Sequence, residues 1–235
     1  MLDVEGTTTP VEFVHQLLFP YARARVQEFI ERHGAEPDVR ADLTALYAEH
    51  VAEPPGPQLP PPWRDDTQSV VAYVHWLMDR DRKSTGLKSL QGKIWEAGYR
   101  AGDVRGQVYA DVAPALARWQ GHGRDIAIFS SGSVQAQQCL FANSTAGDLR
   151  PFIRAYFDTT TGPKTAPQSY ERIAEGLEQL PAQVLFLSDM AAELDAARLA
   201  GLHTRLCVRP PAPVPPSSGH PVIRTFDEVL TDDAR

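Results

Sequence analysis

Apolar residues recur at helical spacing throughout the first part of the chain. Between Val11 and Gly102 they return every three or four positions, most regularly over Phe13–Val26 and Val70–Met78. Six of the 20 prolines lie in residues 54–62 and five more in residues 210–216. Because proline lacks a backbone donor, we interpret both clusters as loops, the alternative being recognition motifs for proline-binding domains.

After Gly102 the pattern changes to short apolar runs separated by amphipathic stretches. The runs are Ile126–Phe129, Val184–Leu187 and a weaker one, Thr204–Val208. The amphipathic stretches are Val108–Trp119, Val134–Phe141, Tyr170–Leu177 and Ala191–Leu199. Apolar runs without alternation are typical of strands buried on both faces, and their alternation with helices indicates a parallel sheet. We predict a doubly wound, Rossmann-like α/β core of residues 1–10 and 105–235, with residues 11–104 as an all-helical insert.

Residues able to carry chemistry follow the predicted strands. Asp3 and Glu5 come after the stub Met1-Leu2, Ser130 and Ser131 follow Ile126–Phe129, Asp189 follows Val184–Leu187, and Lys164 lies between the last two runs. Ligands of open α/β sheets bind beyond the carboxyl ends of the strands. We therefore expect one pocket to collect these carboxylates, hydroxyls and the ammonium group.

This set of side chains fits phosphoryl transfer. An aspartate such as Asp3 can attack phosphorus and form an aspartyl-phosphate, while Glu5 protonates the leaving oxygen and later activates water. Mg²⁺ prefers carboxylate oxygens, and a serine loop before a helix favours anions. Lys164 can offset the charge of the phosphate and of Asp3.

Each residue also has a purely structural interpretation. Asp3 and Glu5 taken alone would be solvated charges, residues 130–133 could be an ordinary helix cap, and a lone lysine is usually at the surface. Asp189 is the strongest candidate, because an unpaired charge is costly to bury after an apolar run. For Glu193, one helical turn further on, a place in the site and a place on the helix surface are equally favoured.

Composition narrows the class of protein. The 235 residues are 43% hydrophobic and 23% charged, which excludes a disordered, collagen-like or low-complexity chain. A net charge of −7 argues against a nucleic-acid partner, and no apolar run is long enough to span a membrane. We expect no signal peptide and, with Cys139 and Cys207 as the two cysteines, no disulfide framework. We expect a monomer in the cytoplasm.

Asp3, Ser131, Lys164 and Asp189 resemble the four motifs of the haloacid dehalogenase-like superfamily. Glu5 stands where the usual first motif has a second aspartate, and this variant resembles the enolase-phosphatase (acireductone synthase) family of methionine salvage. The supporting stretches are residues 6–10, Phe19-Pro20-Tyr21, residues 81–83, residues 87–92, Trp95, residues 129–133 and residues 156–159. The similarity extends over almost the whole chain.

The resemblance implies a hydrolase that enolises 2,3-diketo-5-methylthiopentyl-1-phosphate and then removes its phosphate to give the acireductone. It makes Asp3 the nucleophile and Glu5 the acid/base. One Mg²⁺ per subunit is held by Asp3, Glu5 and Asp189, with Glu5 acting through its carboxylate or its backbone carbonyl. Ser130, Ser131 and Lys164 bind the substrate, and the helical insert is a cap over the site. No residue is identified as the enolisation base.

The start of the chain departs from the family, whose members carry a full apolar strand before the first motif. Here only Met1 and Leu2 precede Asp3, so we expect the natural start further upstream or a shortened chain. Two alternative functions remain open: a capped Mg²⁺-dependent phosphatase of another small phosphorylated metabolite, and an inactive binding module if the short start is real.

Overall fold

The computed structural model describes residues 1–56, 59–64, 66–215 and 219–230. The chain forms two compact units, one made of Met1–Val14 with Arg105–Arg235 and the other of His15–Val104. The described parts of both proline clusters contain neither helix nor strand, as predicted, while residues 57, 58 and 216 of those clusters lie outside the described residues.

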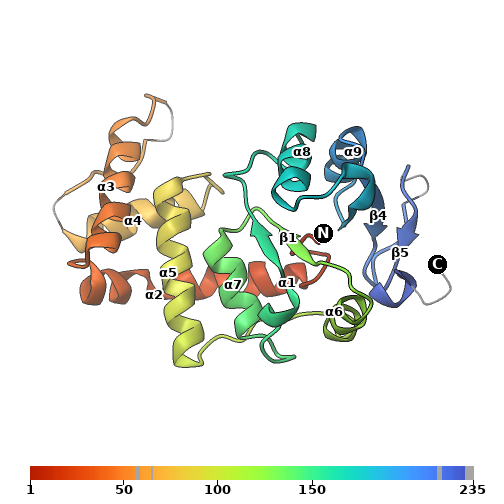
Figure 1. The fold of residues 1–235 in the computed structure, drawn as a ribbon. Coiled ribbons are helices and arrows are strands. Elements are labelled where there is room, and N and C mark those ends of the chain that lie inside the picture. The colour runs from red at the N-terminus through yellow and green to blue at the C-terminus, as the bar shows by residue number, and fades with distance from the viewer. Residues whose placement is uncertain (57–58, 65, 216–218, 231–235) are drawn as a thin grey trace. The chain divides into compact units, whose positions relative to one another are not determined.

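The first unit is built on a parallel sheet (Figure 1). Its strands are β1 (Ala127–Phe129), β2 (Ala155–Phe157), β3 (Leu185–Ser188), β4 (His203–Cys207) and β5 (Val222–Ile223). β1 pairs with β2, and β3, β4 and β5 pair in that order. Leu2 bridges the two groups through Ile128 and Leu187, which gives one sheet of order β2, β1, Leu2, β3, β4, β5.

The backbone of Met1–Asp3 lies between β1 and β3 and bonds to both. Leu2 N–H donates to the Ala127 carbonyl at 2.8 Å, and Phe129 N–H donates to the Leu2 carbonyl at 2.9 Å. On the other side, Asp3 N–H donates to the Leu187 carbonyl at 3.0 Å. This double pairing brings Asp3 to the carboxyl end of the sheet, between the ends of β1 and β3.

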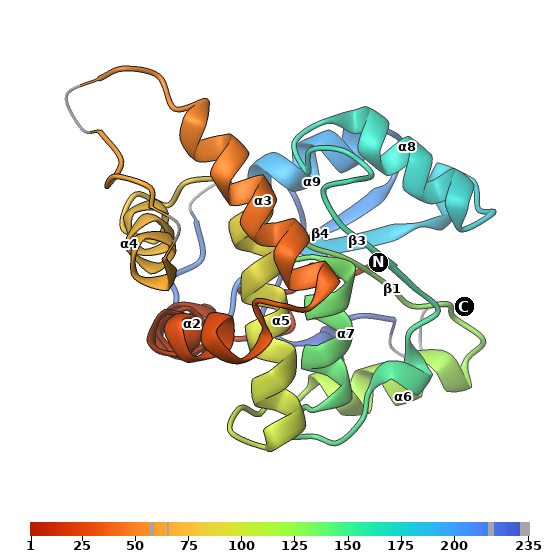
Figure 2. The same ribbon diagram turned by 90° about the vertical axis from the view of Figure 1, so that its left-hand side faces the viewer.

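Helices cover both faces of this sheet. α8 and α9 lie over one face, and α6 and α7 lie over the other (Figures 1 and 2). Their bounds, with the short turns, are α1 (Val11–Phe13), α6 (Val112–Gly121), α7 (Val134–Ala142), η2 (Arg150–Phe152), α8 (Pro167–Gly176), η3 (Pro181–Gln183), α9 (Ala191–Leu199) and η4 (Phe226–Glu228). The predicted doubly wound α/β class is confirmed.

A continuous apolar core joins the sheet to α8 and α9. Tyr170 and Ile173 of α8 and Leu194 of α9 are fully buried against Phe129 and Phe186 of the strands. Burial of each large side chain contributes roughly 1.5–3 kcal/mol. This packing holds the strand ends, and therefore the residues that follow them, in fixed positions.

The second unit is helical. Its elements are a π-helical turn η1 (Val14–Leu18), which begins in the first unit, and α2 (Phe19–His33), α3 (Pro37–Val51), α4 (Thr67–Met78) and α5 (Thr85–Ala101). Ser84 caps α5 by accepting from Leu87 N–H, and Gly102 ends it at a φ of +78°. Trp95 of α5 is buried and donates to the Leu18 carbonyl at 2.8 Å, so it packs inside this unit. No helix in the described part of the chain is long and apolar enough to cross a membrane.

The two cysteines differ in exposure, which predicts different reactivity. Cys207 is buried in β4, and burial raises the pKa of its thiol to about 11, whereas Cys139 is partly exposed. Because the thiolate is the reactive form, we expect iodoacetamide at mildly alkaline pH to modify Cys139 at least about tenfold faster than Cys207 in the native protein. Peptide mass spectrometry measures both rates, and equal labelling of the native thiols would contradict this placement.

Candidate active site

Four charged side chains meet at the carboxyl end of the sheet. Lys164, on the loop between β2 and α8, places its Nζ 2.5 Å from Asp3 Oδ1 and 2.6 Å from Glu193 Oε2. Asp189 directly follows β3, and Glu193 lies in the first turn of α9. The predicted residues Asp3, Lys164 and Asp189 therefore come from segments far apart in the sequence, and Glu193 joins them.

Lys164 is held as a cation by its neighbours. Burial by itself lowers the pKa of this ammonium, but the charges of Asp3 and Glu193 and their hydrogen bonds outweigh burial, so the pKa is raised. Its Nζ also lies 5.7 Å from the centre of the Phe129 ring. The ammonium thus offsets part of the negative charge that the carboxylates concentrate here.

Ser188 connects Glu193 to Asp3. Its hydroxyl donates to Glu193 Oε2 at 2.9 Å and lies 3.5 Å from Asp3 Oδ2, and it accepts from Met190 N–H at 3.1 Å. Neither Ser188 nor Glu193 belongs to the six site residues that the sequence predicts. The only signal was the position of Glu193 one helical turn after Asp189.

Replacing Lys164 by Met leaves Asp3 and Glu193 as buried, unpaired carboxylates. We expect a loss of about 3–5 kcal/mol in the free energy of unfolding at neutral pH. The pKa of Glu193 is already raised, by burial and by the charge of Asp3, and losing Lys164 raises it further. A folded carboxyl with a raised pKa binds protons more tightly than the unfolded one, so the deficit should shrink as pH falls and grow as pH rises. Urea titrations of the Lys164→Met variant across pH measure this, and a deficit independent of pH would contradict it.

Asp189 lies against the turn that follows Asp3. Burial raises the pKa of Asp189 to about 7, and the charges of Asp3 and Glu193 act in the same direction. Its backbone N–H donates to Thr7 Oγ1 at 3.0 Å. Gly6 has a φ of +70°, and a Cβ at that position would lie 2.2 Å from Asp189 Oδ2. Only glycine therefore leaves room for this carboxylate.

Glu5 lies in the tight turn between Asp3 and Thr9. It is half-buried, and its backbone pairs with that of Thr9. Gly6 N–H donates to the Thr9 carbonyl at 2.8 Å, and Thr8 Oγ1 donates to the Asp3 carbonyl at 3.2 Å. These bonds fix the backbone of the turn that carries both Asp3 and Glu5.

The serine loop follows β1 and leads into α7. Ser130 is buried and its Oγ accepts from Gly132 N–H at 3.1 Å, whereas Ser131 is exposed. Ser133 is the N-cap of α7 and accepts from Ala136 N–H at 3.2 Å. The loop thus contains the helix cap of the structural interpretation and also a helix N-terminus, where anions are favoured. Within the described residues, no hydrogen bond or ion pair joins Ser130 or Ser131 to the cluster around Lys164.

The donor set suits a hard divalent cation. No three His, Cys, Asp or Glu side chains in the described part of the chain converge as a ready metal-binding group. The expected Mg²⁺ ligands are the carboxylates of Asp3 and Asp189 and a third donor from Glu5, which is either its carboxylate or its backbone carbonyl. All are oxygens, as Mg²⁺ prefers, and the nearby charges of Asp3 and Glu193 add to the effect of burial in raising the pKa of Asp189.

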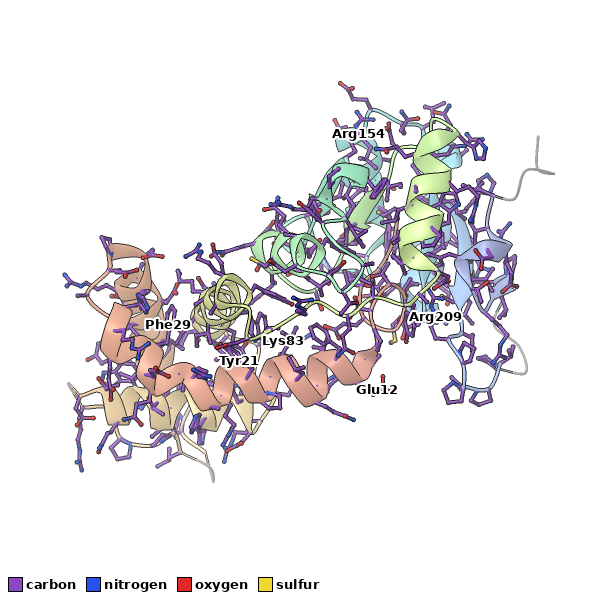
Figure 3. All side chains as sticks on the ribbon, turned by 90° about the horizontal axis from the view of Figure 1, so that it is seen from below. Glu12, Tyr21, Phe29, Lys83, Arg154 and Arg209 are labelled. Carbon is purple, nitrogen blue, oxygen red and sulfur yellow. The ribbon has the colours of Figure 1, made fainter. Side chains whose placement is uncertain are left out.

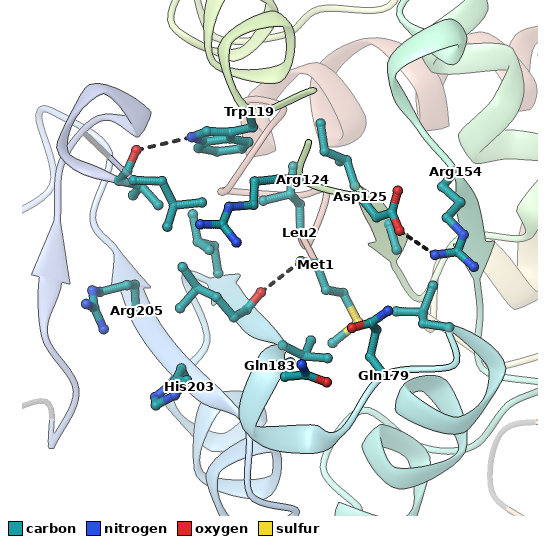
Figure 4. Close-up of a pocket in the computed structure, with 18 of the residues that line it drawn as sticks. Met1, Leu2, Trp119, Arg124, Asp125, Arg154, Gln179, Gln183, His203 and Arg205 are labelled. Carbon is teal, nitrogen blue, oxygen red and sulfur yellow. Dashed lines mark hydrogen bonds and ion pairs between the residues drawn. The ribbon is translucent and has the colours of Figure 1, made fainter. Parts of the chain in front are cut away.

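A cavity of about 660 Å³ lies at the opposite, amino end of the strands. It is lined by residues such as Met1, Trp119, Arg124, Arg205 and Gln183 (Figure 4). None of the six expected site residues lines it. Because ligands of parallel sheets bind at the carboxyl ends, this cavity is not the active site.

Known proteins with similar sequences and structures identify the family to which this site belongs. Residues 1–201 match the sequence model of the haloacid dehalogenase-like hydrolases. The crystal structure of the UTR4 protein from Saccharomyces cerevisiae is similar, with a TM-score of 0.80, 34% identity and coverage of 97% of each chain. The chain belongs to the haloacid dehalogenase-like hydrolases.

Two curated relatives narrow the assignment. Enolase-phosphatase E1 of Synechococcus elongatus is 55% identical over 229 residues, covering 97% of this chain and 96% of that protein. Enolase-phosphatase E1 of Sorangium cellulosum is 45% identical over 229 residues, covering 97% of this chain and 95% of that protein. Within the hydrolases, the chain belongs to the enolase-phosphatase family, as its motifs predict.

Proposed function

We propose that this chain is the Mg²⁺-dependent enolase-phosphatase that converts 2,3-diketo-5-methylthiopentyl-1-phosphate to the acireductone. The observation that carries the phosphatase half is the buried cluster in which Lys164 bonds both Asp3 and Glu193. Family membership supports the enolase half. The oxygen donors expected from Asp3, Glu5 and Asp189 support the Mg²⁺ dependence, because Mg²⁺ prefers such ligands.

Asp3 acts as the nucleophile. Its carboxylate attacks phosphorus and forms an aspartyl-phosphate, while the bond from phosphorus to the enol oxygen breaks and that oxygen takes a proton from Glu5. Glu5 then removes a proton from water, whose oxygen attacks phosphorus, releases phosphate and restores Asp3. Lys164, at 2.5 Å from Asp3 Oδ1, offsets charge on the carboxylate and on the arriving phosphate.

The remaining site residues bind the substrate and the metal. Ser130 and Ser131, at the end of β1, join Lys164 in holding the phosphate oxygens. Asp3, Asp189 and the Glu5 carbonyl hold one Mg²⁺, which supplies charge stabilisation to the phosphoryl group when bound. The assignment is supported by the buried position of Asp3 at the sheet edge and by Gly6, which leaves room for Asp189.

We assign the helical unit the role of the cap, which excludes water and contacts the methylthio end of the substrate. Its five consecutive helical elements, without a strand among the described residues, support an inserted domain rather than an extension of the sheet. A cytoplasmic location and a monomeric state stay predictions.

Turnover of the diketone phosphate tests the proposal. The assay follows the absorbance of the enol and the free phosphate together, with Mg²⁺ and after its removal by a chelator. We expect the enol to form first and phosphate release to depend on Mg²⁺. Faster turnover of generic sugar phosphates than of the diketone would instead indicate a phosphatase of another metabolite.

A further inference from the structure

Arg209 is a buried arginine directed at the turn that carries the site. It lies two residues beyond the end of β4 (Figure 3), and its exposed fraction is 7%. Its Nε and Nη2 both donate to the backbone carbonyl of Thr7, at 2.9 and 2.7 Å. One guanidinium therefore saturates a buried carbonyl oxygen in the turn between Glu5 and Thr9.

The guanidinium is fixed from its other sides. Asp111 forms an ion pair with Nη1 at 2.5 Å and also accepts from Phe226 N–H at 2.6 Å. The rings of Tyr109 and Phe226 lie 4.3 and 4.5 Å from the guanidinium carbon. A planar group held by these contacts has little freedom, and a lysine could not reproduce its two convergent bonds to the Thr7 carbonyl.

Thr7 transmits this restraint to the metal-binding loop. The Thr7 side chain is fully buried, and its hydroxyl accepts from Asp189 N–H at 3.0 Å. The carbonyl and the hydroxyl of one residue thus join Arg209 to the backbone of Asp189. A shift of Thr7 would move Asp189 relative to Asp3.

We propose that Arg209 is a positioning residue that holds the Asp3 and Asp189 loops in register through Thr7. Its hydrogen bonds go to Thr7, Asp111 and Arg224, so it acts on the reacting groups only through the turn. Misplacement of a ligand or nucleophile by about 1 Å can reduce a rate by about 10²-fold. The inference rests on the proposed Mg²⁺ site but not on the identity of the substrate.

The first test is Arg209→Lys, which keeps the charge beside Asp111 but loses the paired bonds. We expect the Kd for Mg²⁺, measured by isothermal titration calorimetry, to rise at least about tenfold, and kcat with p-nitrophenyl phosphate to fall similarly at saturating Mg²⁺. KM should stay within about threefold, because Arg209 does not touch the substrate. Arg154→Lys is the matched control: it makes the same change at an arginine that forms its ion pairs with Asp125 and Glu178, and it should leave Mg²⁺ affinity and kcat within about threefold.

The second test is the pair Thr7→Val and Thr7→Ser, which does not depend on Arg209→Lys folding. Thr7→Val should weaken Mg²⁺ binding as Arg209→Lys does, and Thr7→Ser should restore it. The variant that combines Arg209→Lys with Thr7→Val should bind Mg²⁺ no more weakly than the weaker of the two single variants, because both changes break the same chain of contacts. A folded Arg209→Lys or Thr7→Val variant with wild-type Mg²⁺ affinity, or strictly additive effects, would overturn the proposal. Failure of the wild type on the diketone alone would count against the proposed function only.

Discussion

Replacing Asp3 by Asn is expected to reduce phosphate release by at least about 10³-fold, the scale of losing a covalent nucleophile. The amide has nearly the shape of the carboxylate, but it cannot form the aspartyl-phosphate, and it removes the charge that Lys164 offsets. Enolisation does not need the covalent step and should be partly retained. The diketone phosphate assay separates the two, because the enol absorbance would rise while free phosphate stays near background.

Asp195→Asn is the matched control, because it makes the same chemical change on α9 at an exposed carboxylate bonded to Arg198. We expect both signals to stay within about twofold of the wild type, as for most surface substitutions. Normal phosphate release by the Asp3→Asn variant would exclude Asp3 as the nucleophile.

Gly6→Ala should impair phosphatase activity at limiting Mg²⁺ nearly as strongly as Asp3→Asn impairs phosphate release, although it adds only a methyl group. The new Cβ would lie 2.2 Å from Asp189 Oδ2, so this carboxylate or the whole turn must move. We expect the Mg²⁺ concentration for half-maximal activity to rise by about 10² or more, since the change displaces a ligand. Titration of phosphatase activity with Mg²⁺ measures this directly.

Gly123→Ala is the control that separates the steric clash with Asp189 from the free-energy cost of placing an alanine in the left-handed conformation. Gly123 has a φ of +69°, almost the same as the +70° of Gly6, but no atom lies within 4 Å of its Cβ position. Both variants should lose about 1–2 kcal/mol of stability from the left-handed conformation. Only Gly6→Ala should change the Mg²⁺ response, and equal responses would show that Asp189 tolerates displacement.

Three of the five strands in the described residues coincide with runs that the sequence predicts, including the weaker run Thr204–Val208, which corresponds to β4. Ile126–Phe129 and Val184–Leu187 correspond to β1 and β3, which are buried on both faces of the sheet. β2 and β5 were not predicted. β5 has two residues, too few for any periodicity, and the residues of β2 are only half-buried, so their pattern carries little signal. Both exist because they extend a sheet that the stronger strands establish.

In the site, too, the residues identified by local sequence could be predicted, whereas the contacts that depend on the folded chain could not. Asp3 and Asp189 could be predicted because each lies just beyond an apolar segment, and Lys164 because it lies between two such runs. The motif resemblance then gave these residues their roles. The bond of Lys164 to Glu193 and the role of Ser188 as a link depend on how three separate loops converge. Arg209 gave no signal at all, because its partner Thr7 is 202 residues away and only the folded sheet brings the two together.

In the proposed mechanism Asp3 is the residue that becomes phosphorylated, and direct trapping of the aspartyl-phosphate tests this. The wild-type enzyme is mixed with Mg²⁺ and the diketone phosphate, quenched in acid within a single turnover, digested, and examined by mass spectrometry. We expect one added phosphoryl group on the N-terminal peptide, located at Asp3, and absent in the Asp3→Asn variant. A phosphoryl group on any other residue, or rapid turnover by the Asp3→Asn variant, would contradict it.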